Sequence, residues 1–140
     1  MINSSAAVSA ELGLNLMVPE HGAVPLVASL YYSADDPFAI RMAFHVGTDE
    51  PVEWIFARDL LATGLEGPAG EGDVQVWPDD VHGREILNIA LSSPFGEAHF
   101  EAPLGATAAF LTRTFEVIAA GNEADFIDLD SELLELLWRA

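Results

Sequence analysis

The side chains that could do chemistry include a histidine set between two glutamates. His99 stands between Glu97 and Glu101, and strand alternation would place all three side chains on one face. One histidine and two carboxylates could in principle hold a zinc ion. However, positions two and four residues apart on a strand are spread along its length, so they converge poorly on one ion. We therefore interpret this row as a solvated polar face and predict no metal site.

Catalytic motifs are absent from the rest of the sequence. There is no G-x-S-x-G or H-E-x-x-H pattern, and Ser92 and Ser93 stand in a turn rich in Pro and Gly. The glycine-rich stretch 64–72 lacks the lysine and the following Ser or Thr of a phosphate-binding loop. The chain has no cysteine, which excludes disulfides, thiolate metal sites and a cysteine nucleophile. We predict no enzymatic activity, no catalytic residue and no cofactor.

Net charge limits the class of partner. Five arginines stand against 23 acidic residues, for a formal net charge of −18. Nucleic-acid binding needs cations that replace the counterions on phosphates, and anionic membrane surfaces make the same demand. Nucleic acid and membrane surfaces are therefore poor partners, whereas a basic patch on another protein would be attracted.

Length and hydropathy predict a single domain. A chain of 140 residues can bury a proper core, and we assign residues 1–140 to one domain with residues 1–6 disordered. No basic residue precedes Arg41, so we expect no signal peptide. No apolar run approaches the length of a membrane span, and we expect a cytoplasmic location.

The element that organises the chain is residues 52–61. Val52, Trp54 and Phe56 alternate with Glu53, Ile55 and Ala57, which is the period of a strand, and a short helix with a glycine stop follows from Asp59 to Gly64. The sequence therefore predicts a strand that turns directly into a helix and buries Trp54 and Phe56. The same patterns predict strands at 8–18, 24–32, 38–46, 73–77, 85–91 and 97–102, and a helix at 103–121.

A last helix, beginning at Asp130 or Ser131, carries several leucines and a tryptophan. These residues are more than one narrow stripe can bury. Docking on the domain's own core and contact with a partner both remain open. Residues 78–84 are predicted to be a turn with two adjacent aspartates. The residues that we predict to bind a partner are Asp79, Asp80, Asp130, Glu132, Leu136, Leu137 and Trp138.

The order of elements predicts the fold class. Four strands, a helix, three or four strands and then helices give an α+β fold with two antiparallel sheets. Several stretches also resemble the SsgA-like family of sporulation and cell-division proteins of actinomycetes, and the resemblance covers about Val8 to Leu137. The stretches are Val52–Leu61, Gly72–Pro78, Ile89–Pro94, Gly96–Ala98, Glu101–Pro103, Phe110–Leu111, Arg113–Thr114 and Phe126–Leu133.

The resemblance implies more than the residues alone. It implies a Whirly-like fold in a bell-shaped homotrimer, located at the division septum. It also implies a non-enzymatic scaffold that marks septation sites, is positioned with an SsgA-type protein and recruits the tubulin-like protein FtsZ during sporulation. The Whirly-like fold raises a competing function, a single-stranded nucleic-acid-binding or regulatory module, which would need Arg41, Arg58 and Arg84 to cluster. A third possibility is a small ligand between the sheets, lined by Phe44, Trp54 and Trp77.

Overall fold

Apolar and polar residues alternate along several stretches of the chain, and in the described residues these stretches form seven strands. The structure is a computed structural model that describes residues 7–47, 50–70 and 72–126. Its elements, in chain order, are β1 (Ala7–Val18), β2 (Gly22–Ser33), β3 (Ala39–His45), β4 (Val52–Ala57), α1 (Arg58–Gly64), β5 (Val74–Val81), β6 (Arg84–Ser93), β7 (Gly96–Pro103), α2 (Leu104–Val117) and a 3₁₀ turn (Glu123–Phe126).

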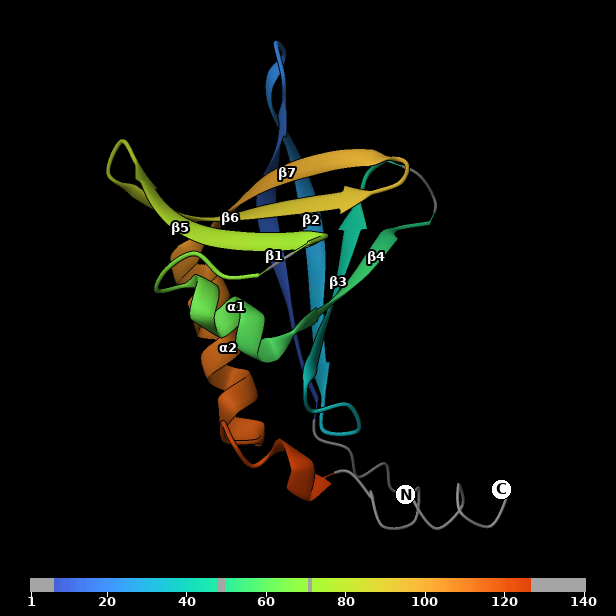
Figure 1. Cartoon of the computed structure of the whole chain (residues 1–140), viewed down its shortest axis with the longest axis vertical. Coiled ribbons are helices and arrows are strands. Elements are labelled where there is room, and N and C mark those ends of the chain that lie inside the picture. Colours follow the sequence, from blue (N-terminus) through green and yellow to red (C-terminus); the bar gives the residue numbers. More distant parts are fainter. Residues whose placement is uncertain (1–6, 48–49, 71, 127–140) are drawn as a thin grey trace.

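All seven strands belong to one curled antiparallel sheet in the order β4-β3-β2-β1-β7-β6-β5 (Figure 1). The α+β prediction is confirmed, but the prediction of two separate sheets is wrong. The two predicted groups of strands exist, and β1 and β7 join them through the pairs Asn15–Glu101 and Leu16–Phe100. Turn residues in the sequence predict the hairpins within each group. The pairing of β1 with β7 joins strands that are far apart in the chain, so no turn residues predict it.

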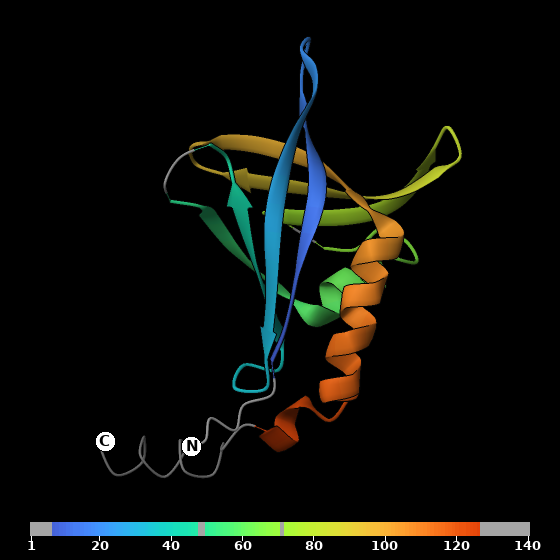
Figure 2. The same cartoon turned by 180° about the vertical axis from the view of Figure 1, so that it is seen from behind.

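The core lies on the concave face of the curled sheet. Aromatic and branched residues from both groups of strands meet there, and Phe44 of β3 stacks on Phe100 of β7 with ring centroids 4.4 Å apart. The helices α1 and α2 pack together against this face, next to β1, β5 and β6 (Figures 1 and 2). Within the described ranges, no helix is long and apolar enough to cross a membrane.

Two element boundaries differ from the sequence prediction. Strand β5 continues to Val81, so Asp79 and Asp80 lie on a strand and only His82 and Gly83 form the turn, with φ of 53° and 80°. Two successive positive φ values twist the chain as a two-residue hairpin requires. Helix α2 ends at Val117 and not at Gly121, because Ile118 takes an extended conformation. The predicted disorder of residues 1–6 and the predicted last helix lie outside the described residues.

Candidate partner-binding surface

The hairpin of β5 and β6 extends away from the body of the molecule (Figure 1). Its tip carries both aspartates of the sequence prediction, and both are exposed. The backbone N–H of Gly83 donates to Asp80 Oδ1 at 2.9 Å, and the N–H of Asp80 donates to Asp79 Oδ1 at 2.8 Å. Each carboxylate thus has one oxygen engaged in shaping the hairpin. Because both side chains are exposed, their other oxygens can accept hydrogen bonds from a cationic group.

The tip is acidic on balance and includes an apolar residue. Glu85 lies opposite Asp80 in the strand register of the hairpin, and Arg84 lies opposite Val81. The side chain of Val81 is exposed. Exposed carboxylates around a small apolar residue suit a basic surface on another protein. The five other residues predicted to bind a partner lie outside the described residues; they are Asp130, Glu132, Leu136, Leu137 and Trp138.

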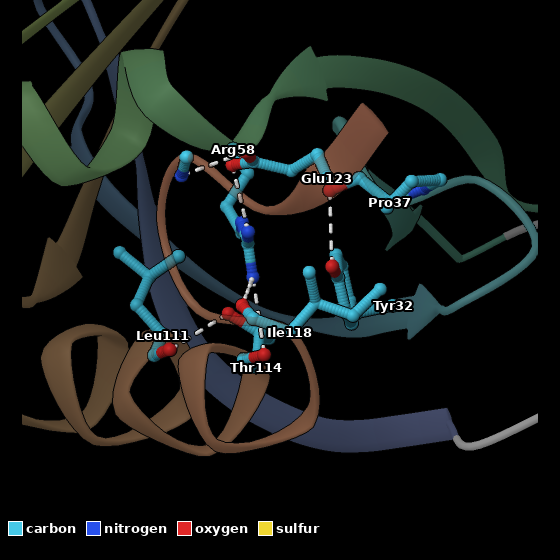
Figure 3. A network of polar contacts seen from close by, with 8 residues as sticks. Tyr32, Pro37, Arg58, Leu111, Thr114, Ile118 and Glu123 are labelled. Carbon is cyan, nitrogen blue, oxygen red and sulfur yellow. Dashed lines mark hydrogen bonds and ion pairs between the residues drawn. The ribbon is translucent and has the colours of Figure 1, made fainter. Parts of the chain in front are cut away.

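Away from this hairpin, a buried arginine connects helix α1 to the end of helix α2. Arg58, the first residue of α1, is only 1% exposed. Its Nη1 donates to the carbonyl oxygens of Thr114 at 3.1 Å and Ile118 at 2.8 Å, and its Nη2 donates to Glu123 Oε2 at 2.8 Å (Figure 3). The Thr114 hydroxyl donates in turn to Leu111 O at 2.7 Å. Arg58 thereby provides the donors that the last turn of α2 needs when the helix ends at Val117.

Aromatic rings complete the surroundings of Arg58. The guanidinium carbon lies 4.2 Å from the ring centroid of Phe115 and 4.9 Å from that of Tyr32. Its hydrogen bond holds the pKa of Glu123 below the ordinary value of 4.5. Burial raises the pKa of Tyr32, against the opposing effect of Arg58, and the Tyr32 hydroxyl donates to Pro37 O at 3.0 Å. Arg58 is therefore a structural anchor whose charge is neutralised inside the protein.

Sequence reasoning named Arg58 only as one of three arginines that a nucleic-acid site would need, and it did not predict that Arg58 is buried. The available signal was a lone cation inside the apolar stretch 52–61, where a charge must find partners. The position of Arg58 also argues against nucleic-acid binding. Arg58 is buried, Arg41 lies on β3 within 3.8 Å of Glu53, and Arg84 lies four strands away at the start of β6. The three arginines do not form the cluster that such a function would need.

The row around His99 is a structural polar face. His99 Nε2 lies 2.7 Å from Asn88 Oδ1, and its ring stacks on Trp77 with centroids 5.6 Å apart. Among the described residues, no three His, Cys, Asp or Glu side chains gather closely enough to hold a metal ion. Trp77 shares this outer face, because it pairs with Asn88 while its neighbour Val76 is in the core. It therefore does not line a cavity with Phe44 and Trp54, as a ligand site between sheets would require.

Comparisons with known proteins decide the family. The family described as "Streptomyces sporulation and cell division protein, SsgA" matches residues 26–123. The chain belongs to the SsgA family. It is 54% identical over 137 residues to the sporulation-specific cell division protein SsgB of Thermobifida fusca, covering 98% of this chain and 99% of that protein. It is 49% identical over 133 residues to the SsgB of Streptomyces coelicolor, covering 95% and 97%.

Solved structures of SsgA-family proteins share the fold. The crystal structure of the T. fusca protein superposes with a TM-score of 0.86 at 54% identity, covering 96% of this chain and 98% of the other. A structure described as "Mutations in SsgB correlate to longitudinal cell division during sporulation of Streptomyces coelicolor" gives the same TM-score at 46% identity, covering 91% and 100%. The resemblance expected from the sequence is therefore confirmed at the level of the family, and these structures share the α+β fold of this chain.

Proposed function

We propose that this protein is a non-enzymatic scaffold of sporulation-specific cell division that marks septation sites and recruits FtsZ. Its curated relatives are named sporulation-specific cell division proteins, which supports a role in division. The observation that carries the proposal is the β5–β6 hairpin, which presents Asp79 and Asp80 at an exposed and projecting tip. A projecting acidic hairpin suits contact with a basic surface of a larger assembly.

The proposal includes a location and an assembly. The protein acts in the cytoplasm at the division septum, as a Whirly-like homotrimer positioned with an SsgA-type protein. Three copies would present three acidic hairpins to one polymer, so weak single contacts would add up through multivalency. The C-terminal residues Asp130, Glu132, Leu136, Leu137 and Trp138 form a second proposed contact.

The test is co-pelleting of the purified protein with polymerising FtsZ from an actinomycete, at low and moderate salt. We expect the wild type to pellet with polymer and a double variant, Asp79→Asn with Asp80→Asn, to pellet several-fold less at low salt. The matched control is Glu11→Gln with Glu116→Gln, which removes the same charge from exposed positions elsewhere.

Two outcomes would refute the proposal. If the wild type does not pellet with polymer, the division role must work through a different partner. If it instead shifts a single-stranded oligonucleotide in a parallel assay, the nucleic-acid alternative replaces the scaffold. Equal pelleting of the hairpin variant and its control would remove the hairpin from the contact and leave the C-terminal residues as the proposed site.

A further inference from the structure

Strand β4 is an edge strand whose outer side has no partner in the described part of the chain. The N–H of Arg58 donates to Phe38 O at 2.7 Å, so the pairs with β3 that exchange hydrogen bonds are those of Val52, Trp54 and Phe56. By the same alternation, Glu53, Ile55 and Ala57 direct their backbone N–H and C=O groups away from the sheet. These groups form a template for one more strand.

An apolar groove lies beside this edge, on the concave face. It encloses about 300 Å³. Its wall on the β3–β4 side includes Phe44, Val52 and Trp54, and its wall on the β6–β7 side includes Phe95 and Phe100. Phe95 is 99% exposed and Val52 is 48% exposed, whereas Phe44 and Phe100 belong to the core. The groove is therefore the uncovered continuation of the core.

The other edge of the sheet is protected, which makes the bare edge of β4 informative. On β5, Val76 exchanges two backbone hydrogen bonds with Ala69, at 2.8 and 2.9 Å. Pro78, two residues further on the same outward side, has no N–H to offer, and Asp79 and Asp80 charge the end of the strand. Strand β4 has neither a proline nor a covering segment in the described residues, and Ile55 is 63% exposed on it.

We infer that the edge of β4 and the groove beside it bind an extended segment of a partner protein that alternates apolar with basic residues. The segment would pair its backbone with Glu53, Ile55 and Ala57, and place alternate side chains over Val52 and Trp54. The charge of the chain favours basic residues in the segment: the formal net charge is −18, Glu97 is the one charged residue that lines the groove, and Glu53, exposed on the edge, has a long ion pair of 3.8 Å with the exposed Arg41. This is a different surface from the β5–β6 hairpin, and it does not depend on the proposed function.

Two other occupants fit less well. A second copy has the same net charge of −18, so it would bring two strongly acidic chains together. The chain's own residues 127–140 carry four carboxylates and one arginine, so their charge also opposes that of Glu53 and Glu97. Both occupants are outcomes that the experiment distinguishes.

The experiment measures binding of a fluorescein-labelled synthetic peptide by fluorescence anisotropy. The peptide has about ten residues that alternate Val or Phe with Lys or Arg, and its affinity is compared between wild type and variants. Ile55→Pro removes an outward N–H without removing a hydrogen bond of the sheet, so the fold tolerates it. The matched control, Ile55→Thr, keeps the N–H and the branched side chain. We expect Ile55→Pro to weaken binding about tenfold or more and Ile55→Thr to weaken it no more than about threefold.

Changes in the peptide and in the groove distinguish binding through backbone hydrogen bonds from non-specific binding through side chains or charge. A peptide with N-methylated amides on its pairing side keeps its side chains and should lose binding by a similar factor. Phe95→Ser should weaken binding about threefold, and Glu97→Gln should weaken it by a smaller factor that disappears at high salt. A peptide with Glu in place of Lys and Arg should not bind.

The inference is overturned if the wild-type protein does not bind the peptide. It is also overturned if two affinities both equal that of the wild-type protein for the unmodified peptide: the affinity of Ile55→Pro for the unmodified peptide, and the affinity of the wild-type protein for the N-methylated peptide. Light scattering tests the other occupants. If Ile55→Pro lowers the molar mass of the free protein, a second copy occupies the edge. If truncation after Phe126 strengthens peptide binding about tenfold, the chain's own C-terminal segment occupies it. Either result contradicts a partner segment, whereas an unchanged mass and affinity support it.

Discussion

The two ends of the concave face carry similar apolar residues and differ in what covers them. At the helix-covered end, where α1 and α2 pack on the sheet, Phe56 of β4, Leu61 of α1 and Phe110 of α2 are each at most 2% exposed. At the open end, the groove between β4 and the β6–β7 turn leaves Val52 and Phe95 in solvent. Among the described residues, helices therefore cover one end of the concave face and leave the other end open.

This difference suggests that the helix-covered end determines the stability of the fold and that the open end is available for binding. The helix-covered end also holds the one buried arginine of the described residues, with its partners on three different segments. Substitutions there should change the free energy of unfolding, because the side chains are buried and tightly packed and the terminal nitrogens of Arg58 are hydrogen-bonded. Substitutions at the open end should leave it nearly unchanged and alter binding. The following predictions, in decreasing order of expected effect, test that separation.

Replacing Arg58 should have the largest effect. Arg58→Met keeps a long apolar side chain but removes the donors to Thr114 O, Ile118 O and Glu123. We expect the free energy of unfolding to fall by about 3 kcal/mol, as measured by urea denaturation. Arg41→Met is the control, because that arginine is exposed and its ion pair with Glu53 is long, so its cost should stay below about 0.5 kcal/mol. Equal costs for the two variants would contradict the anchor role of Arg58.

Adding a methyl group at Gly64 should come second. Gly64 is the last residue of α1, and a Cβ there would lie 2.3 Å from Val76 Cγ2 and 3.1 Å from Val76 Cβ. Gly64→Ala should cost about 1–3 kcal/mol, because α1 must move away from β5. The double variant with Val76→Ala should cost less than the sum of the two single changes. Additive costs, measured by thermal unfolding, would show that the clash is relieved in another way.

Acid should weaken the helix-covered end through Glu123. The pKa of Glu123 is lower in the folded protein than its ordinary value of 4.5, so the folded state favours the charged form. The resulting stability is fully present above pH 4.5 and is lost as the pH falls through the folded pKa. In urea titrations, the gap between wild type and Glu123→Gln should be widest near pH 6 and should narrow below pH 4.5. A constant gap over this range would exclude a contribution from the charge.

Phe95→Ser should have the smallest effect on stability. Phe95 is 99% exposed in the turn after β6, and its N–H donates to Ser93 Oγ at 3.1 Å, a bond that the substitution keeps. We expect the free energy of unfolding, measured by urea denaturation, to change by less than about 0.5 kcal/mol. A loss as large as that of Gly64→Ala would mean that the open end is part of the packed core, and the comparison between the two ends would fail.

Local patterns predicted the elements better than their assembly. Alternation located all seven strands, and Gly64 correctly marked the end of α1. The β5 boundary was missed because Pro78 and two aspartates look like a turn, although an edge strand accommodates them on its outer side. The end of α2 was missed because Arg58, almost 60 residues earlier, supplies the hydrogen bonds that stop the helix at Val117.

The candidate surfaces were predictable only in part. Asp79 and Asp80 were singled out from sequence, and the structure places them at an exposed tip. The free edge of β4 was not found, because an edge is defined by which strand lies last in the sheet. That order depends on the pairing of β1 with β7, which no local motif reports.

The β1–β7 pairing has a consequence for how the protein folds. Each group of strands consists of hairpins between neighbours, which can form early because their loops are short. The two groups then meet through Asn15–Glu101 and Leu16–Phe100, and this contact closes a loop of roughly 85 residues. Because the entropy of that closure must be lost before the core is complete, we expect the docking of the two groups to limit the folding rate. We therefore expect substitutions next to this short ladder of two residue pairs to slow the folding of the domain more than substitutions in the hairpins do.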